Sequence, residues 1–556
     1  MIKKIIPIVL FLLYQLGFSQ NTLTETQKLA ATCKVWGFLK YYHPNVASGE
    51  QNWDQQLFDI LPKIKEADNK EEFSNVLEKW VDNLGEVKKI EPIIVSDTIK
   101  YFDKNFDLSW IEKNKLFSKN LSKKLEFIEK NRFQGEQFYI YLDVNKDTNA
   151  SEGIRLQNET YYPDFKWDNF NLRILTLFKY WNIIEYFYPN KYLMDQGWEK
   201  SLTDALPKFI ICKSEKEFHD SINEVIVRLN DSHTSYYPVY EGLVIHKYFL
   251  PVLFSFIDNK MVITRILNED FAKKIDIKLG DVILSINEKL ISDVIKENRS
   301  TVTASNEASY LRNLALKFRR FEQEKIIIKF IRDSKTITKT IELYDDINFF
   351  HDLNVQPSEK YKIIENNIGY VNMGVNLDKV FDALVSKLKT TKAIIFDLRN
   401  YPKSQVVNEL TKFINSKPIA YAKSTNPDLR YPSRFYWSKP LLLEGSKDNY
   451  KGKIIVLINE ETQSWSETIA MSFKTSINTT VIGSQTSGAD GAVVNINLMK
   501  GVDTSITGAG FYYPNETQVQ RIGIIPNIEL HPTIAGIQQG RDEVLDRAIK
   551  FINIGK

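Results

Sequence analysis

Apolar positions in the C-terminal third of the chain alternate between short strand-like runs and longer runs at helical spacing. Such alternation is typical of an α/β core with parallel strands. Residues 357–552 are therefore predicted to form this core. The expected strands are Ile368–Val375, Ala393–Leu398, Lys453–Asn459 and Thr480–Gly483, and the expected helices are Leu377–Leu388, Val406–Ile414 and Ser464–Phe473.

Residues 245–346 follow a different pattern, with short apolar strands between turn residues. A small β domain is the expected result. Its strands include Met261–Thr264 and Asp281–Asn287. Lys325–Ile331 and Thr336–Leu343 are predicted to close it as a hairpin around Asp333-Ser334.

The first 240 residues contain an internal repeat with an offset of 145 positions. Val35–Asn45 matches Tyr180–Asn190, and the match continues without a gap to Leu84 and Leu229. An ungapped match of this length indicates a duplication. Both copies show helical spacing, so we expect a duplicated helical region, with the first copy in residues 20–165 and the second in 166–240.

The two copies differ just after their last helix. The second ends in Asp231-Ser232-His233-Thr234, whereas the first reads Glu86-Val87-Lys88. A histidine titrates near neutral pH and can serve as a general base. Two interpretations stay open: His233 is functional, or it is incidental in a copy that only adds stability.

Residues 1–19 have the features of a secretory signal, with Lys3 and Lys4 before an apolar run, Ile5–Leu16, and small residues before a cut after Ser19. The run is too short to span a bilayer comfortably, and no later run is long enough. The prediction is an exported protein, periplasmic or secreted, without stable membrane insertion.

Composition narrows the function classes further. At 556 residues, two to four domains are expected, and a net charge of +3 argues against nucleic acid as the main partner. Cys33 and Cys212 are interpreted as buried small apolar residues. The six histidines are scattered without a His-Glu-x-x-His pair, so no metal and no cofactor are predicted.

Ser464 lies where the strand Lys453–Asn459 gives way to the next helix. A serine at this kind of turn has its hydroxyl beside free helix N–H groups, which can hold a developing oxyanion. An ordinary helix cap explains the same residues, because Glu467 three positions later completes a capping box.

Three landmarks occur in a fixed order: Asp231–Thr234, Ile395–Asn400 and Ser464–Glu467. Between the first two, Leu279-Gly280-Asp281 and the strand ending in Asn287 resemble the late part of a PDZ domain. This order resembles C-terminal processing peptidases and tricorn-type serine peptidases, over roughly residues 170–552. The fold implied is a multidomain α/β protein with a duplicated helical N-terminal region, a PDZ-like β domain and an α/β catalytic core with parallel strands.

The resemblance implies that Ser464 is the nucleophile. Where processing peptidases have a lysine base, this chain has Ala489, so the resemblance points to the branch with a histidine base. It then implies His233 as general base and Ser232 as its orienting residue. The implied oxyanion donors are the backbone N–H groups of Trp465 and of either Lys403 or Ser404.

The chain departs from the family pattern at two places. Asn400–Ser404 replaces a glycine pair, and Gln520-Arg521 stands where the tricorn type has a glutamate. Asp490 is a candidate substitute for that acid. Asp397 and Arg399 are interpreted as a structural ion pair at a strand end.

Two functions from different classes fit these residues. One is an exported serine endopeptidase that cleaves unfolded polypeptides or C-terminal tails by acyl transfer, taking its polypeptide partner through the PDZ-like groove. The other is a catalytically impaired peptide- or glycan-binding protein on the same fold. The sequence leaves the oligomeric state open.

Overall fold

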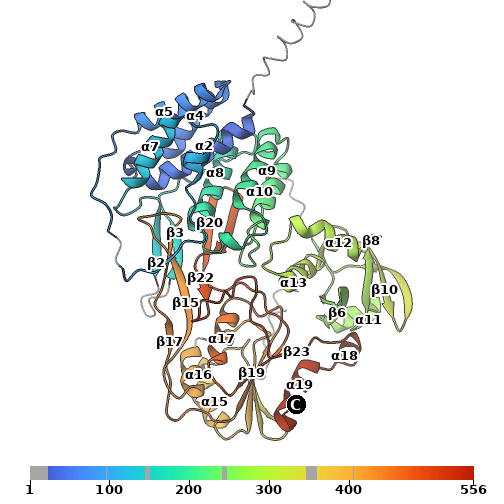
Figure 1. The fold of residues 1–556 in the computed structure, drawn as a ribbon. Coiled ribbons are helices and arrows are strands. Elements are labelled where there is room, and N and C mark those ends of the chain that lie inside the picture. Colours follow the sequence, from blue (N-terminus) through green and yellow to red (C-terminus); the bar gives the residue numbers. More distant parts are fainter. Residues whose placement is uncertain are drawn as a thin grey trace, which may run out of the picture.

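The computed structural model describes residues 23–94, 97–144, 151–240, 247–345, 360–404 and 406–555. Figure 1 shows a helical part, a smaller mixed domain beside it and an α/β core below. The predicted export signal at residues 1–19 lies outside the described ranges. Within those ranges, none of the helices combines the length and apolar character that a membrane crossing requires.

The α/β core is built on a six-stranded sheet with the strand order β12-β13-β14-β18-β19-β23. All neighbouring pairs are parallel except β12–β13, so β12 is an antiparallel edge. The strands are β12 (Tyr361–Ile364), β13 (Ile368–Asn372), β14 (Ala393–Asp397), β18 (Lys453–Ile458), β19 (Thr479–Gly483) and β23 (Ile528–Glu529).

Helices cover both faces of this sheet, because its central strands are apolar on both sides. One face packs on α15 (Phe381–Leu388), α16 (Val407–Ile414) and α17 (Trp465–Lys474). The other packs on α19 (Glu543–Ile554), which α18 (Ile534–Gln538) precedes. The strands and helices predicted for the core are confirmed, except that Leu377–Leu388 begins as a short 3₁₀ turn, η4 (Asp378–Val380).

The core also carries strands that the sequence did not predict. A second sheet joins β1 from the helical part to four core strands, and a separate hairpin lies nearby. The core strands are β15 (Ile419–Pro427), β16 (Phe435–Trp437), β17 (Leu441–Leu443) and β22 (Gly510–Tyr512), with the hairpin β20 (Val493–Met499) and β21 (Val502–Thr507). In Figure 1 the hairpin reaches up from the core into the helical part. Its apolar side chains join the core of that part.

Residues 247–345 form the mixed domain, with an antiparallel sheet in the order β11-β10-β7-β6-β5 and β8 beside β7. The predicted hairpin is confirmed, and Asp333 and Ser334 both adopt positive φ at its turn. The elements are β4 (Tyr248–Phe249), β5 (Val252–Ile257), β6 (Lys260–Ile266), α11 (Glu269–Ile275), β7 (Val282–Ile286), β8 (Lys289–Leu290), α12 (Ile291–Glu297), η3 (Asn298–Ser300), α13 (Glu307–Lys317), β9 (Arg320–Phe321), β10 (Lys325–Arg332) and β11 (Lys335–Glu342).

Two helix triplets of matching layout make up most of the helical part. The first is α2 (Glu25–Tyr42), α4 (Trp53–Glu66) and α5 (Lys70–Asn83), and the second is α8 (Phe170–Phe187), α9 (Trp198–Ile211) and α10 (Glu215–Val227). Corresponding helices begin 145 positions apart, as the repeat does. Between and beside them lie α3 (Pro44–Ala47), β1 (Tyr101–Phe102), α6 (Trp110–Lys113), α7 (Lys119–Lys130), β2 (Ile140–Val144), β3 (Ser151–Leu156) and η2 (Lys191–Leu193).

The same tryptophan pair links the first two helices of each triplet. In the first, the indole of Trp36 donates to the carbonyl of Trp53 at 3.3 Å, and Trp53 donates back at 3.1 Å. In the second, Trp181 and Trp198 do the same at 3.2 and 3.0 Å. Both pairs stack with ring centroids 6.1 and 6.3 Å apart. The two triplets therefore share one internal packing scheme.

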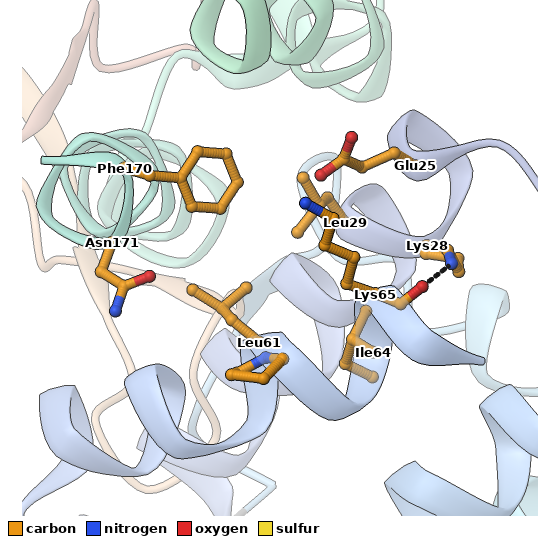
Figure 2. Close-up of a pocket in the computed structure, with 9 residues that line it drawn as sticks. Glu25, Lys28, Leu29, Leu61, Ile64, Lys65, Phe170 and Asn171 are labelled. Carbon is orange, nitrogen blue, oxygen red and sulfur yellow. Dashed lines mark hydrogen bonds between the residues drawn. The ribbon is translucent and has the colours of Figure 1, made fainter. Parts of the chain in front are cut away.

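A cavity of about 220 Å³ lies where α2 and α8 begin, against the end of α4. Figure 2 shows the ring of Phe170 and the side chains of Leu29 and Leu61 around it. None of the predicted site residues lines this cavity. Cys33 is buried and Cys212 is only half-buried, which corrects the expectation that both are buried; both are free thiols.

Candidate active site

Ser464 occupies a tight turn between β18 and α17. Its φ of 57° and ψ of −123° lie in a region that non-glycine residues rarely adopt. The Ser464 N–H donates to the carbonyl of Ala489 at 2.9 Å and to the Glu467 carboxylate at 3.2 Å. The second contact is one half of the predicted capping box. An ordinary N-cap residue has extended backbone. The strained backbone of Ser464 differs from it and is typical of functional residues.

The buried carboxylate of Glu467 holds this turn from behind. It accepts hydrogen bonds from the hydroxyl of Thr486 and from the N–H groups of Gly488 and Ala489, the latter two at 2.9 and 3.0 Å. Burial raises the pKa of Glu467, although these donors oppose the shift. The segment in which the family lysine was expected therefore supports the Ser464 turn through its backbone.

The two predicted oxyanion donors differ in their surroundings. Trp465 is the first residue of α17, so its N–H has no partner within the helix and lies at the positive end of the helix dipole. The Lys403 N–H instead donates to the carbonyl of Met373 at 3.3 Å, and the Lys403 residue is exposed. The Lys403 N–H is therefore already engaged, and the structure gives no support for its predicted role.

His233 follows the end of α10 and is buried. Its Nδ1 lies 2.9 Å from the hydroxyl of Thr507 on β21. Its Nε2 is buried and has no hydrogen-bond partner among the described residues. The Ser232 hydroxyl points elsewhere, since it accepts from the Ser305 N–H at 2.8 Å while Ser305 Oγ accepts from Ser232 N–H at 2.7 Å. Thr507, not Ser232, is the side chain that contacts the imidazole.

Asp231 lies behind this contact and is fully buried. Its carboxylate accepts from the Thr507 hydroxyl at 3.0 Å, from the Thr507 N–H at 2.9 Å and from the His233 N–H at 3.0 Å. Gln520 and Tyr188 donate to it as well, at 3.1 and 3.3 Å.

This arrangement selects one tautomer of the imidazole. The Thr507 hydroxyl has one proton, and a carboxylate can only accept. Because that proton goes to Asp231, the Thr507 oxygen must accept from Nδ1–H of His233. The lone pair of His233 then lies on Nε2, the nitrogen without a partner, as a general base requires.

The loops of Ser464 and His233 touch each other. Gln463 Nε2 donates to the carbonyl of Ser232 at 3.3 Å, so the contact joins the residues that directly precede Ser464 and His233. Arg312 from α13 donates to Gln463 Oε1 at 2.7 Å and to Ser487 Oγ at 2.6 Å. The mixed domain thus supports the same junction.

Electrostatics keep the histidine neutral. Burial lowers the pKa of His233 below its usual value, the charge of Asp231 opposes this shift, and the charge of Arg312 adds to it. A base with a lowered pKa is unprotonated at neutral pH and is ready to accept a proton.

Other predicted residues have structural roles. Asp490 accepts from Thr468 Oγ1 at 2.8 Å and from Gly491 N–H at 2.7 Å, so its partners lie on the Ser464 side and not at His233. Asp397 and Arg399 form the expected ion pair at 2.7 Å. In the described part of the chain, no group of three or more His, Cys, Asp or Glu side chains has the layout of a metal site.

Sequence reasoning gave Thr507, Asp231 and Arg312 no role. Asp231 had a usable signal, because an acid two residues before a candidate histidine can reach its backbone. Thr507 and Arg312 had none, because their contacts with the site depend on tertiary packing.

Parts of the chain match a family model and a known protein. Residues 367–530 match Peptidase family S41. The chain is 27% identical over 214 residues to the carboxy-terminal-processing protease of Bartonella bacilliformis, a match that covers 36% of this chain and 47% of that protein. The chain thus spans about half the length of the curated relative it matches.

Two solved structures share the fold. The structure of mature CPAF complexed with lactacystin matches with a TM-score of 0.55 at 14% identity, over 70% of this chain and 99% of that chain. The crystal structure of mature CPAF matches with a TM-score of 0.54 at 17% identity, over the same shares of the two chains.

Proposed function

We propose that this chain, whose residues 367–530 form a domain of Peptidase family S41, is an exported serine endopeptidase that cleaves unfolded polypeptides or C-terminal tails. Ser464 is the nucleophile and His233 the general base. The observation that carries the proposal is the junction of the two loops through Gln463 and Ser232, together with the buried Nε2 of His233, which has no partner among the described residues.

The reaction proceeds by acyl transfer. Ser464 Oγ attacks the scissile carbonyl carbon while its proton passes to His233 Nε2. The tetrahedral intermediate then collapses, and the leaving amine takes that proton from Nε2 as the peptide bond breaks. Water repeats the two steps on the acyl-enzyme and releases the acid. Through both cycles, Thr507 and Asp231 hold the imidazole and stabilise its charged form.

The negative charge of the intermediate develops beside the start of α17. There the Trp465 N–H and the helix dipole favour an oxyanion over the neutral carbonyl. The strained φ of Ser464 fixes the hydroxyl at this end of the helix.

The other parts of the chain serve delivery and support. Residues 247–345 act as a PDZ-like domain that takes an extended polypeptide at a sheet edge. Arg312 and Ser305 connect this domain to the loops of Ser464 and His233, and this connection supports a role of the domain in delivering substrate. The matched triplets of the helical part arose by duplication. The pattern of residues 1–19 supports export.

The test is cleavage of casein and of a mixed peptide library by the mature chain, read by mass spectrometry. Ser464→Ala and His233→Ala should lose roughly 10³-fold or more of the cleavage rate. Ser466→Ala is the matched control for the serine, since the Ser466 hydroxyl is buried and has no partner among the described residues. Lys88→Ala controls for the histidine, because Lys88 is its counterpart 145 positions earlier.

Both controls should cleave as the wild type does. Cleavage at wild-type rate by folded Ser464→Ala or His233→Ala would refute the assignment. Circular dichroism spectra that match the wild type establish that each variant is folded.

A further inference from the structure

Each helix triplet forms a cleft beside its tryptophan pair, and one ion pair crosses each cleft between the triplets. Lys179 of α8 pairs with Asp54 of α4 at 2.9 Å. The positions 145 residues away are also paired, since Lys34 of α2 contacts Glu199 of α9 at 2.8 Å. The two clefts therefore share this ion pair and the tryptophan pair, and what fills one indicates what fits the other.

The cleft at Lys179 is filled by the chain itself. The carboxylate of Glu159, from the segment that follows β3, lies between Lys40 and Lys179, with 3.1 Å to the latter. Lys179 also donates to the carbonyl of Thr160 at 3.3 Å. Burial raises the pKa of Glu159, but the two lysines outweigh it, so the pKa is lowered and the group is a carboxylate. An extended segment with a buried carboxylate thus completes this cleft.

The cleft at Lys34 is open. A cavity of about 640 Å³ lies there, lined by the second tryptophan pair and by several residues between 104 and 115. Lys34 contacts Glu199 at its edge, and its ammonium lies 5.5 Å from the ring of Trp110. No segment of the described chain places a carboxylate on Lys34 as Glu159 does on Lys179.

The charge of the open cleft favours an anion. Its lining has more lysines than acids: Lys34, Lys104, Lys113, Lys115 and Lys191 against Asp107, Glu185 and Glu199. At the position equivalent to Lys40 stands Glu185, but Lys191 pairs with it at 2.8 Å. Gly197, which precedes α9 without a side-chain cap, also lines the cavity.

We infer that the Lys34 cleft binds the carboxylate of an extended polypeptide, an acidic side chain or a C-terminus, in the place that Glu159 takes in the equivalent cleft. The site goes beyond the proposed cleavage, and its occupancy is measured without cleavage. For a peptidase it would be a second anchor for acidic substrate chains, apart from the PDZ-like groove.

The test is fluorescence anisotropy with the folded mature Ser464→Ala chain, so that no peptide is consumed. The probe is the chain's own segment 156–163, dye-labelled and amidated, which carries Glu159 as its one carboxylate. A second peptide has Glu159→Gln, and a third has Glu159→Gln with a free C-terminal carboxylate. Binding of the first alone identifies an acidic side chain, and binding of the third identifies a terminal carboxylate. Both results support the site.

The protein variant K104Q/K113Q/K115Q removes three lysine charges from the lining of the cleft. This variant should raise the Kd of the carboxylate-bearing peptide by about tenfold or more, since charge-assisted hydrogen bonds are lost. The matched control is K379Q/K417Q/K447Q, which makes the same charge change at exposed lysines of the α/β core and should leave the Kd unchanged. Equal binding of the amidated Glu and Gln peptides, no binding by either carboxylate-bearing peptide, or equal losses in the two triple variants would overturn the inference.

Discussion

The two helix triplets share helix layout, tryptophan pairing and ion pairing, yet only the second leads into the candidate active site. After α5 the chain continues with the exposed Glu86 and Lys88. The counterparts after α10 are Asp231, which is fully buried, and His233, which is 8% exposed. The difference comes from the β20–β21 hairpin, whose Thr507 contacts both residues. The two copies of one scaffold thus differ in a few residues and in one distant partner.

The largest difference between the two copies is expected when the carboxylate of Asp231 and that of its counterpart Glu86 are each replaced by an amide. Asp231→Asn should lower kcat/KM by about 10²-fold or more, because an amide cannot accept from all five donors and the imidazole loses its orientation. Glu86→Gln, at the equivalent exposed position, should leave kcat/KM unchanged. Steady-state kinetics on one quenched peptide substrate measure both. Equal effects in the two variants would mean that Asp231 has no special part.

Thr507 offers a smaller change at the same place. Thr507→Val removes the hydroxyl between Asp231 and His233 and should lower kcat by about tenfold or more with little change in KM, since one hydrogen bond to the base is lost. Thr507→Ser keeps the hydroxyl and should restore most of the activity. If the Ser and Val variants are equally slow, the packing of the Thr507 methyl group matters for activity, and its hydrogen bonds to Asp231 and His233 do not.

The charge near His233 can be tested through pH. The general base works unprotonated, so kcat/KM rises as pH rises through the pKa of His233. Burial lowers that pKa most, and the charge of Arg312 lowers it further. Arg312→Gln should therefore move the acidic limb of the pH profile to higher pH, whereas Arg312→Lys keeps the charge and should move it less. An acidic limb at the same pH in wild type and Arg312→Gln would contradict this electrostatic account.

The smallest expected effect concerns stability and lies outside both triplets. Burial raises the pKa of Asp490 well above its usual value, and the nearby Glu467 adds to the shift. With a folded pKa above the unfolded one, stability is greatest at low pH and falls as pH rises above the unfolded pKa. Asp490→Asn should thus stabilise the chain by about 1 kcal/mol at pH 8 and much less at pH 5. Urea unfolding at both pH values measures this, and a larger gain at pH 5 would refute it.

The α/β core was predictable because its strands and helices alternate along the chain and each apolar run has a clear length. The turn at Ser464 and the difference between the repeats at His233 could both be seen in the sequence, and both residues remain predicted site residues. The strands β15–β17 and β20–β22 were not predicted. They are short or half-exposed, and their pairing joins distant segments.

The residues that hold Ser464 and His233 in place could not be predicted from the sequence, because they come from distant segments. The hydrogen bonds from Thr507 to Asp231 span 276 positions, and Arg312 reaches the Ser464 loop from another domain. Two groups named by the family resemblance have other partners in the structure. The Ser232 hydroxyl pairs with Ser305, and the Lys403 N–H donates to the carbonyl of Met373.

The central claim is that Ser464 is a nucleophile activated by His233, and covalent labelling tests it without any knowledge of the substrate. The mature chain and its Ser464→Ala, Ser466→Ala and His233→Ala variants would each be treated with a fluorophosphonate, and the adducts mapped by mass spectrometry. We predict one adduct, on Ser464, in the wild type and in Ser466→Ala, none in Ser464→Ala, and much slower labelling in His233→Ala. A folded wild-type chain that stays unlabelled would contradict the account. Equal labelling of the wild type and of Ser464→Ala would contradict it as well.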